Sequence, residues 1–208
     1  MQHIFVDFEM TSGNKINSTE IIEIGAVKLN ERFEVIDAYK SYIKPNSINN
    51  ITKKITRITG ISQDMLSCER QFQEVVQEFT QWIGNQDTVL YQWGPDDKKQ
   101  LVSEYERKIG NIIPIQFNNW VDTQLEFMQI FDMRNQISLE QVLDMLSEEF
   151  KGKQHDALDD AINSAVILKI LKTKEKLEQK KKIINNLHNS QLSCTIGELL
   201  KYKLQGKY

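Results

Sequence analysis

The chain has 208 residues, of which 40% are hydrophobic and 26% are charged, and its formal net charge is −3. This length and composition predict one folded domain with an appendage. No apolar run reaches the roughly 20 residues that cross a bilayer, and Met1 leads directly into an expected strand, so we expect a cytoplasmic protein without a membrane partner. Cys68 and Cys194 lie far apart without CxxC spacing and indicate neither a zinc site nor a disulfide framework.

Hydrophobic periodicity predicts strands first and alternating strands and helices afterwards. The expected strands are 3–9, 20–30, 34–44, 87–92 and about 115–121, and the expected helices are 71–84, 96–109, 122–133, 138–149 and 156–173. The first three strands indicate an antiparallel meander. The whole order predicts an α/β fold with a mixed sheet, and the apolar faces of the later helices are interpreted as core.

Two acidic residues lie in the first expected strand, within the run IFVDFEM. Asp7 and Glu9 are two positions apart, so a strand places both side chains on the same face. Carboxylates held close together repel each other, and their burial is costly unless a cation lies between them. An exposed strand end is the alternative interpretation of this pair.

A third candidate carboxylate follows the expected strand at 87–92. In WGPDDKKQL, Gly94 and Pro95 turn the chain, and Asp96 and Asp97 begin a helix. An acid at this place could be only an N-cap. Two adjacent acids allow Asp96 to cap the helix while Asp97 faces a site.

The last candidate segment, HDALDDA, begins the helix expected at 156–173. His155 lies at the start, Asp160 follows about one and a half turns later, and small residues such as Ala157 and Ala161 form a stripe that would let the helix approach a sheet closely. A capping or surface histidine, with acids that favour the helix dipole, is the alternative.

These motifs, in this order, resemble those of the DEDDh 3′-5′ exonucleases, a DnaQ-like family. FVDFEMT resembles the first motif, WGPDDKKQL the second and HDALDDA the third, and the third has the family spacing of His155, Ala157 and Asp160. EIIEIGAV resembles the family's second strand and ITGIS a family loop. The resemblance runs from about Ile4 to Leu171 and is closest to the small RNA-directed 3′ exonucleases typified by the enhanced-RNAi and histone-message enzyme, with their bacterial relatives.

The resemblance implies a ribonuclease H-like fold of three layers, in which helices flank a mixed five-stranded sheet, over residues 1–175. It spaces the second-motif acid four residues after Trp93, which favours Asp97 over Asp96. The spacing from His155 likewise favours Asp160 over Asp159.

Carboxylates without thiolates suit Mg²⁺ or Mn²⁺, and we expect two ions per site. As a hypothesis, Asp7 bridges ions roughly 3.5–4 Å apart, Glu9 and Asp160 complete one ion, and Asp97 holds the other mainly through water. His155 is assigned as the general base, since an imidazole with an ordinary pKa near ~6.5 accepts a proton at neutral pH.

The expected substrate contacts lie near these motifs. The resemblance places Met10 and Thr11 against the terminal nucleotide. Ile61 and Trp93 could stack on or wedge against a base, at about 1–3 kcal/mol per base, and a core position is the alternative for Trp93.

The expected activity is release of nucleoside 5′-monophosphates from single-stranded RNA ends or short oligonucleotides. A DNA exonuclease of proofreading or repair type stays open, because no residue is identified that would read a 2′-hydroxyl. A non-catalytic RNA-binding module on the same fold is disfavoured because all five site residues are present. The net charge of −3 favours a site that holds only a few terminal nucleotides.

Residues 176–208 are expected to form a helical C-terminal extension. Its first part is rich in lysine and is interpreted as a solvated helix, with an arm that touches RNA or a partner as the alternative. The apolar residues after 183 predict packing on the domain or on a protein partner.

Overall fold

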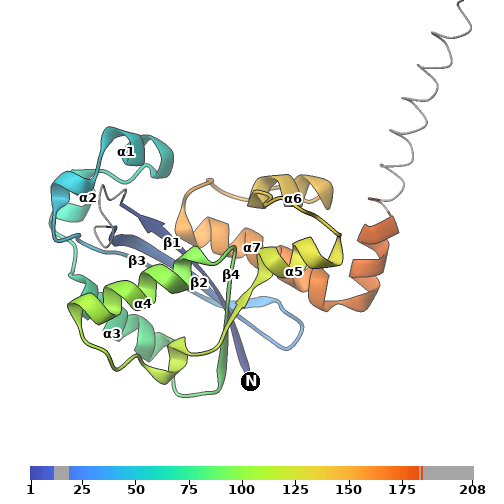
Figure 1. Cartoon of the computed structure of the whole chain (residues 1–208), viewed down its shortest axis with the longest axis horizontal. Helices are drawn as coiled ribbons and strands as arrows, with labels where there is room; N and C mark the ends of the chain where they lie inside the picture. The colour runs from blue at the N-terminus through green and yellow to red at the C-terminus, as the bar shows by residue number, and fades with distance from the viewer. Residues whose placement is uncertain (12–18, 183, 185–208) are drawn as a thin grey trace, which may run out of the picture.

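The computed structural model describes residues 1–11, 19–182 and 184 (Figure 1). Its sheet has five strands in the order β3-β2-β1-β4-β5. The strands are β1 (Gln2–Met10), β2 (Ile21–Leu29), β3 (Val35–Tyr42), β4 (Thr88–Gln92) and β5 (Trp120–Asp122). β1 to β3 form an antiparallel meander, whereas β1, β4 and β5 run parallel, so the sheet is mixed as predicted.

Helices cover both faces of this sheet. They are α1 (Lys53–Thr59), α2 (Gln63–Ser67), α3 (Phe72–Ile83), α4 (Asp96–Lys108), α5 (Thr123–Ile130), α6 (Leu139–Met145) and α7 (Ala157–Lys172). α3 and α4 pack on one face through a core that includes Phe79 and Leu101. α7 lies on the other face, with α5 and α6 beside it (Figure 1). The predicted three-layer α/β arrangement is therefore confirmed.

The observed elements differ from the predicted ones mainly where elements are short. Sequence analysis did not identify α1 and α2, which have seven and five residues, because each spans at most two turns and α1 contains several β-branched residues. The strand expected near 115–121 begins only at Trp120, because Ile115–Phe117 form a 3₁₀ turn.

A further helical segment follows α7 after a break at Thr173, whose backbone is extended. Residues 174–182 are helical, and Leu177 and Ile184 pack with α6 and α7 in one apolar cluster. Lys180 bonds the carbonyl oxygen of Leu146 and pairs with Glu148 at 2.8 Å. The domain boundary at residue 175 stays a prediction, and the expected packing of the chain after 184 lies outside the described residues.

None of the helices in the described part of the chain is long and apolar enough to cross a membrane. The expected cytoplasmic location stays a prediction.

Candidate active site

β1 continues beyond the end of β4 and carries two carboxylates near its C-terminal end. Its pairing with β4 ends at Phe5, opposite Tyr91, so Asp7 and Glu9 extend past the neighbouring strand. Phe5 packs against α7, whereas the alternate residue Val6 packs against the α3 side. Asp7 and Glu9 share the face of Phe5 and therefore lie on the side of the sheet that α7 covers.

The first turn of α7 lies directly against β2. Gly25 is the cross-strand neighbour of Asp7, and a β-carbon built on Gly25 would lie 2.0 Å from the carbonyl carbon of Ala157. Ala161 and Ala165 continue the small buried face of the helix over the sheet. The missing side chain at Gly25 thus lets the helix bring its N-terminal residues next to Asp7.

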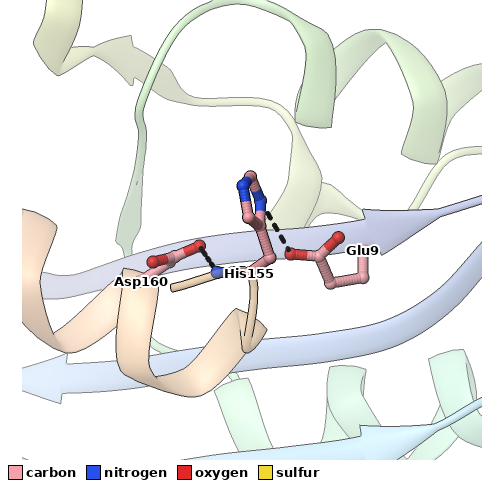
Figure 2. Close-up of side chains that lie close together, drawn as sticks. All are labelled: Glu9, His155 and Asp160. Carbon is pink, nitrogen blue, oxygen red and sulfur yellow. Dashed lines mark hydrogen bonds and ion pairs between the residues drawn. The ribbon is translucent and has the colours of Figure 1, made fainter. Parts of the chain in front are cut away.

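The residues before and within this turn point at Glu9. Figure 2 shows the ring of His155 between the carboxylates of Glu9 and Asp160. The backbone N–H of His155 donates to Oδ2 of Asp160 at 3.0 Å, and Nδ1 of His155 lies 3.9 Å from Oε1 of Glu9. His155 has a φ of 59°, a left-handed conformation that is uncommon for this residue type. The side chain is 56% exposed, so solvent reaches the ring.

A buried asparagine holds the loop that carries His155. Oδ1 of Asn163 accepts from the N–H of Lys151 at 2.9 Å, and Nδ2 donates to the carbonyl oxygens of Lys151 and Asp159 at 2.8 and 2.7 Å. Asp159 in turn accepts from the N–H of Lys153 at 2.8 Å. Asn163 is fully buried and holds the loop to α7 at Lys151, four positions before His155, while Asp159 holds it at Lys153, two positions before His155.

A second buried contact fixes the start of α7 to the sheet. Glu23, the cross-strand neighbour of Glu9, accepts from the N–H of Ala157 at 3.2 Å and pairs with Lys40 at 2.9 Å. Lys40 also pairs with Asp156, whose side chain caps α7 through the N–H of Asp159. Lys40 therefore neutralises Glu23 and Asp156, which hold the start of α7 next to the site.

Asp97 approaches from the first turn of α4 and is 7% exposed. Its carboxylate accepts a hydrogen bond from the backbone of Phe8, the residue between Asp7 and Glu9. Asp96 is exposed and pairs with Lys99, and it makes no capping hydrogen bond. The suggested capping role of Asp96 is therefore wrong, because Gln92 accepts from the N–H of Lys98 in its place.

Burial and mutual repulsion make the site carboxylates, namely Asp7, Glu9, Asp97 and Asp160, hard to ionise. Burial raises the pKa of Asp7 well above its usual range, and the charges of Asp97 and Asp160 raise it further. Burial is also the main cause that raises the pKa of Glu9 to about 8, that of Asp97 to about 8 and that of Asp160 to about 7. Such a cluster favours a cation.

The donor set fits a divalent metal ion. Within the described residues, no lysine or arginine lies within ion-pair distance of a site carboxylate, and the nearby Lys40 is bound to other acids. Ligand atoms of Glu9, His155 and Asp160 all lie within 4.8 Å of one another. Carboxylate oxygens suit Mg²⁺ and Mn²⁺, whereas an imidazole is a poorer ligand for these hard ions.

These residues open into a cleft of about 410 Å³ between β1 and α6. Asp7, Glu9, His155 and Asp160 line one side of it. The other lining residues are Phe8, Trp93, Gln124, Ser138, Leu139, Glu140, Phe150 and Gln154. The cleft thus joins a cluster of acids to an apolar and amide wall, which is suited to a phosphate ester that carries a flat ring.

Residues 4–168 match the protein-family model described as "Exonuclease". The chain belongs to this DnaQ-like exonuclease family. The predicted family resemblance is thereby confirmed, and the protein is a 3′-5′ exonuclease.

The relatives of this exonuclease include a protein of similar length and a much longer one. It is 25% identical over 185 residues to the probable 3′-5′ exonuclease KapD of Bacillus subtilis, covering 86% of this chain and 88% of the relative. It is 31% identical to DNA polymerase III PolC-type of Thermotoga petrophila, covering 84% of this chain but only 12% of that much longer protein. The fold matches the nuclease domain of 3′hExo, a DEDDh family member solved with bound rAMP, at 24% identity and a TM-score of 0.72, covering 81% and 90% of the two chains.

Of the expected substrate residues of this exonuclease, some lie at the cleft and others are buried away from it. Trp93 lines the cleft and packs against Phe127 at 6.4 Å between ring centroids. Ile61 is 2% exposed inside an apolar cluster, so it offers no surface for a base, and this burial argues against the expected stacking. Met10 is half-buried against the core, and the hydroxyl of Thr11 accepts from the N–H of Glu20 at 2.9 Å.

Sequence reasoning missed part of the cleft wall. Phe150 and Gln124 were given no role, although both line the cleft. Leu139, on a helix face expected to be core, does pack against an apolar cluster, and it also lines the cleft. Apolar periodicity assigns such side chains to a helix face, but it does not show which end of that face stays open.

Proposed function

We propose that this exonuclease releases nucleoside 5′-monophosphates from the 3′ ends of single-stranded RNA or short oligonucleotides, with two divalent ions and a histidine base. The observation that carries the proposal is the cluster of site carboxylates, which has no lysine or arginine partner among the residues that the structure describes, beside a solvent-exposed imidazole. Its ligands would be Asp7, Glu9, Asp97 and Asp160, which hold Mg²⁺ or Mn²⁺.

When bound, such ions lower the pKa of a coordinated water and stabilise the leaving 3′-oxygen. His155 accepts the proton of the attacking water, because its exposed ring stands at the mouth of the carboxylate cluster. Asp160 orients His155 through the backbone N–H. Asp160 thus has two proposed roles, as a metal ligand and as the group that positions the base His155.

Recognition of the strand end is assigned to the last residues of β1 and to the far wall of the cleft. The backbone at Met10 and Thr11 closes the end of β1 beside Glu9, and Trp93 supplies an aromatic surface in the cleft. This arrangement favours a free 3′-hydroxyl over a 3′-phosphate, because an added phosphate meets the same acids that repel it.

The choice of RNA is supported by the similar nuclease domain of 3′hExo, which was solved with bound rAMP. A DNA exonuclease is the alternative, because a PolC-type DNA polymerase is also a relative. A protein partner that binds the C-terminal extension belongs to this proposal as well.

The test is degradation of 5′-labelled single-stranded RNA and DNA of matched sequence in Mg²⁺, Mn²⁺ or EDTA, with Asp7→Ala as the control. We expect a metal-dependent ladder that shortens from the 3′ end, with nucleoside 5′-monophosphates as products and no ladder for Asp7→Ala. The ratio of the RNA cleavage rate to the DNA cleavage rate shows whether the enzyme prefers ribose or deoxyribose. If the protein binds RNA but cleaves neither strand in Mg²⁺ or Mn²⁺, the proposed activity is wrong and a binding role takes its place.

A further inference from the structure

α1 carries positive charge on its outer surface. Lys53, Lys54 and Arg57 are exposed, whereas Ile55 and Thr59 turn inward and are buried. Lys53 and Arg57 are one turn apart and share a helix face, with about 5–6 Å between their β-carbons. The first turn of α1 contains no acid.

These charges are not used within the fold. Among the residues that the structure describes, no carboxylate lies within ion-pair distance of Lys53, Lys54 or Arg57. By contrast, Lys40 and Lys169 on other surfaces both pair with acids. The outer face of α1 therefore keeps its full positive charge.

Lys153 connects this face to the cleft. Its Nζ donates to the carbonyl oxygen of Thr59, the last residue of α1, at 2.7 Å. Gly60 leaves the room for this contact, since a β-carbon there would lie 2.2 Å from Nζ. Lys153 is two residues before His155, so positive charge runs from the catalytic loop to the end of α1. We call Lys53, Lys54, Arg57 and Lys153 the α1 basic strip.

A polyanionic substrate needs such a surface here. The protein has a net charge of −3, and the site carboxylates repel every phosphate that is not held against a metal ion. Nucleic-acid affinity depends mainly on lysine and arginine contacts with phosphates. The positive charges of the α1 basic strip offset this repulsion where the strand leaves the site.

We propose that the α1 basic strip binds the phosphates of the single-stranded nucleic acid upstream of the 3′-terminal nucleotide. The inference rests on the proposed function and adds the path of the strand. A strand whose end lies at His155 passes over Lys153 and continues along Arg57 and Lys53. A dinucleotide without a 5′-phosphate has only the phosphate that is cleaved, so it offers the α1 basic strip no upstream phosphate.

The experiment compares kcat/KM for a dinucleotide and for a twelve-nucleotide single strand. The test variant is the triple substitution Lys53→Gln, Lys54→Gln and Arg57→Gln. The control is Lys174→Gln with Lys176→Gln, because these exposed lysines lie beyond the far end of α7, about 24 Å along the helix from Ala157. We expect the preference for the longer strand to fall at least fivefold in the triple variant and to stay unchanged in the control.

Binding of the labelled twelve-nucleotide strand in EDTA supplies a readout that does not need cleavage. For single strands, each lost phosphate contact lowers the slope of log affinity against log salt by about 0.7, so the triple variant should lose about 2 from the slope. If the salt slope and the length preference of the triple variant are unchanged, or if the control loses as much, the α1 basic strip does not bind the strand. The exonuclease assignment is unaffected by that result. Salt-dependent binding through the strip without any cleavage would refute the proposed activity and support the strip.

Discussion

Gly25 and Ala157 touch through their backbones, and this contact sets the distance between β2 and α7. A β-carbon on Gly25 would overlap the carbonyl group of Ala157 at 2.0 Å. Because Gly25 lies opposite Asp7 in the sheet, the same contact sets how closely Asp160 approaches the β1 carboxylates.

Gly25→Ala should therefore impair activity more than folding. The added methyl group pushes the first turn of α7 away from the sheet, and overpacking of this kind costs about 1–3 kcal/mol of stability. A displacement of about 1 Å at a catalytic group reduces the rate by about a hundredfold. Thermal unfolding and single-turnover cleavage measure the two effects.

The matched control is Ala38→Val, which adds volume on the exposed edge strand β3. It should leave both quantities nearly unchanged. If Gly25→Ala keeps full activity, the close approach of α7 is not needed for the site.

Without metal, the stability of the protein should fall as pH rises from about 4 to about 8. The folded pKa values of Glu9, Asp97 and Asp160 are about 8, 8 and 7, which lie above the ordinary carboxyl range. The folded protein therefore binds more protons than the unfolded chain in this window, and stability is lost as these groups ionise. Thermal unfolding in EDTA across this range tests the direction.

Asp97→Asn should remove part of this penalty. In EDTA at pH 8.5 we expect a melting temperature at least 2–4 °C higher, which corresponds to about 1 kcal/mol in a chain of this size. Addition of Mn²⁺ should raise the melting temperature of the native protein and much less that of the variant. A lower melting temperature for Asp97→Asn in EDTA contradicts the repulsion on which the metal proposal depends.

His155→Asn separates the role of a base from that of a ligand. Asparagine tolerates the left-handed backbone found at this position, so the loop should keep its conformation. Loss of a general base reduces the rate by about 10²–10⁴-fold, while the metal-induced rise in melting temperature should persist. Disappearance of that rise would make His155 a ligand instead.

Asn163→Ala should release the loop that presents His155. The change removes the hydrogen bonds that the Asn163 side chain makes to the backbone of Lys151 and Asp159, at a cost of about 1–3 kcal/mol. We expect kcat to fall while KM changes little, since the variant displaces the base and leaves the cleft wall in place.

Ser164→Ala, the next position of α7, is the control. The hydroxyl of Ser164 is buried and has no hydrogen-bond partner in the described part of the chain, so its removal should be neutral or slightly stabilising. Equal losses in both variants would assign Asn163 to general helix packing.

Motif spacing predicted the parts of the site whose geometry is local. Asp7 and Glu9 share a face because strand residues alternate, and their spacing needs no tertiary information. The glycine and proline before Asp97 indicated where a helix begins, and the small residues after His155 indicated a helix that approaches the sheet closely. The layered α/β fold followed from the order of the periodic segments, as the structure confirms.

Individual side chains depended on packing that a linear pattern does not contain. Ile61 and Leu139 are both apolar residues near expected helix or loop boundaries, yet Ile61 is fully buried, whereas Leu139 packs against the core and also lines the cleft. Which of two such residues faces solvent depends on what the rest of the chain places over it.

The sequence by itself determined the set of chemical groups, their order and the fold class, because these depend on residue type and short-range periodicity. Tertiary structure decided that Asp97 and not Asp96 is buried, that Asn163 holds the catalytic loop, and that Lys153 joins α1 to the cleft. Each of these depends on contacts between residues far apart in the chain or on one side of a helix, and such contacts form only when the layers pack together.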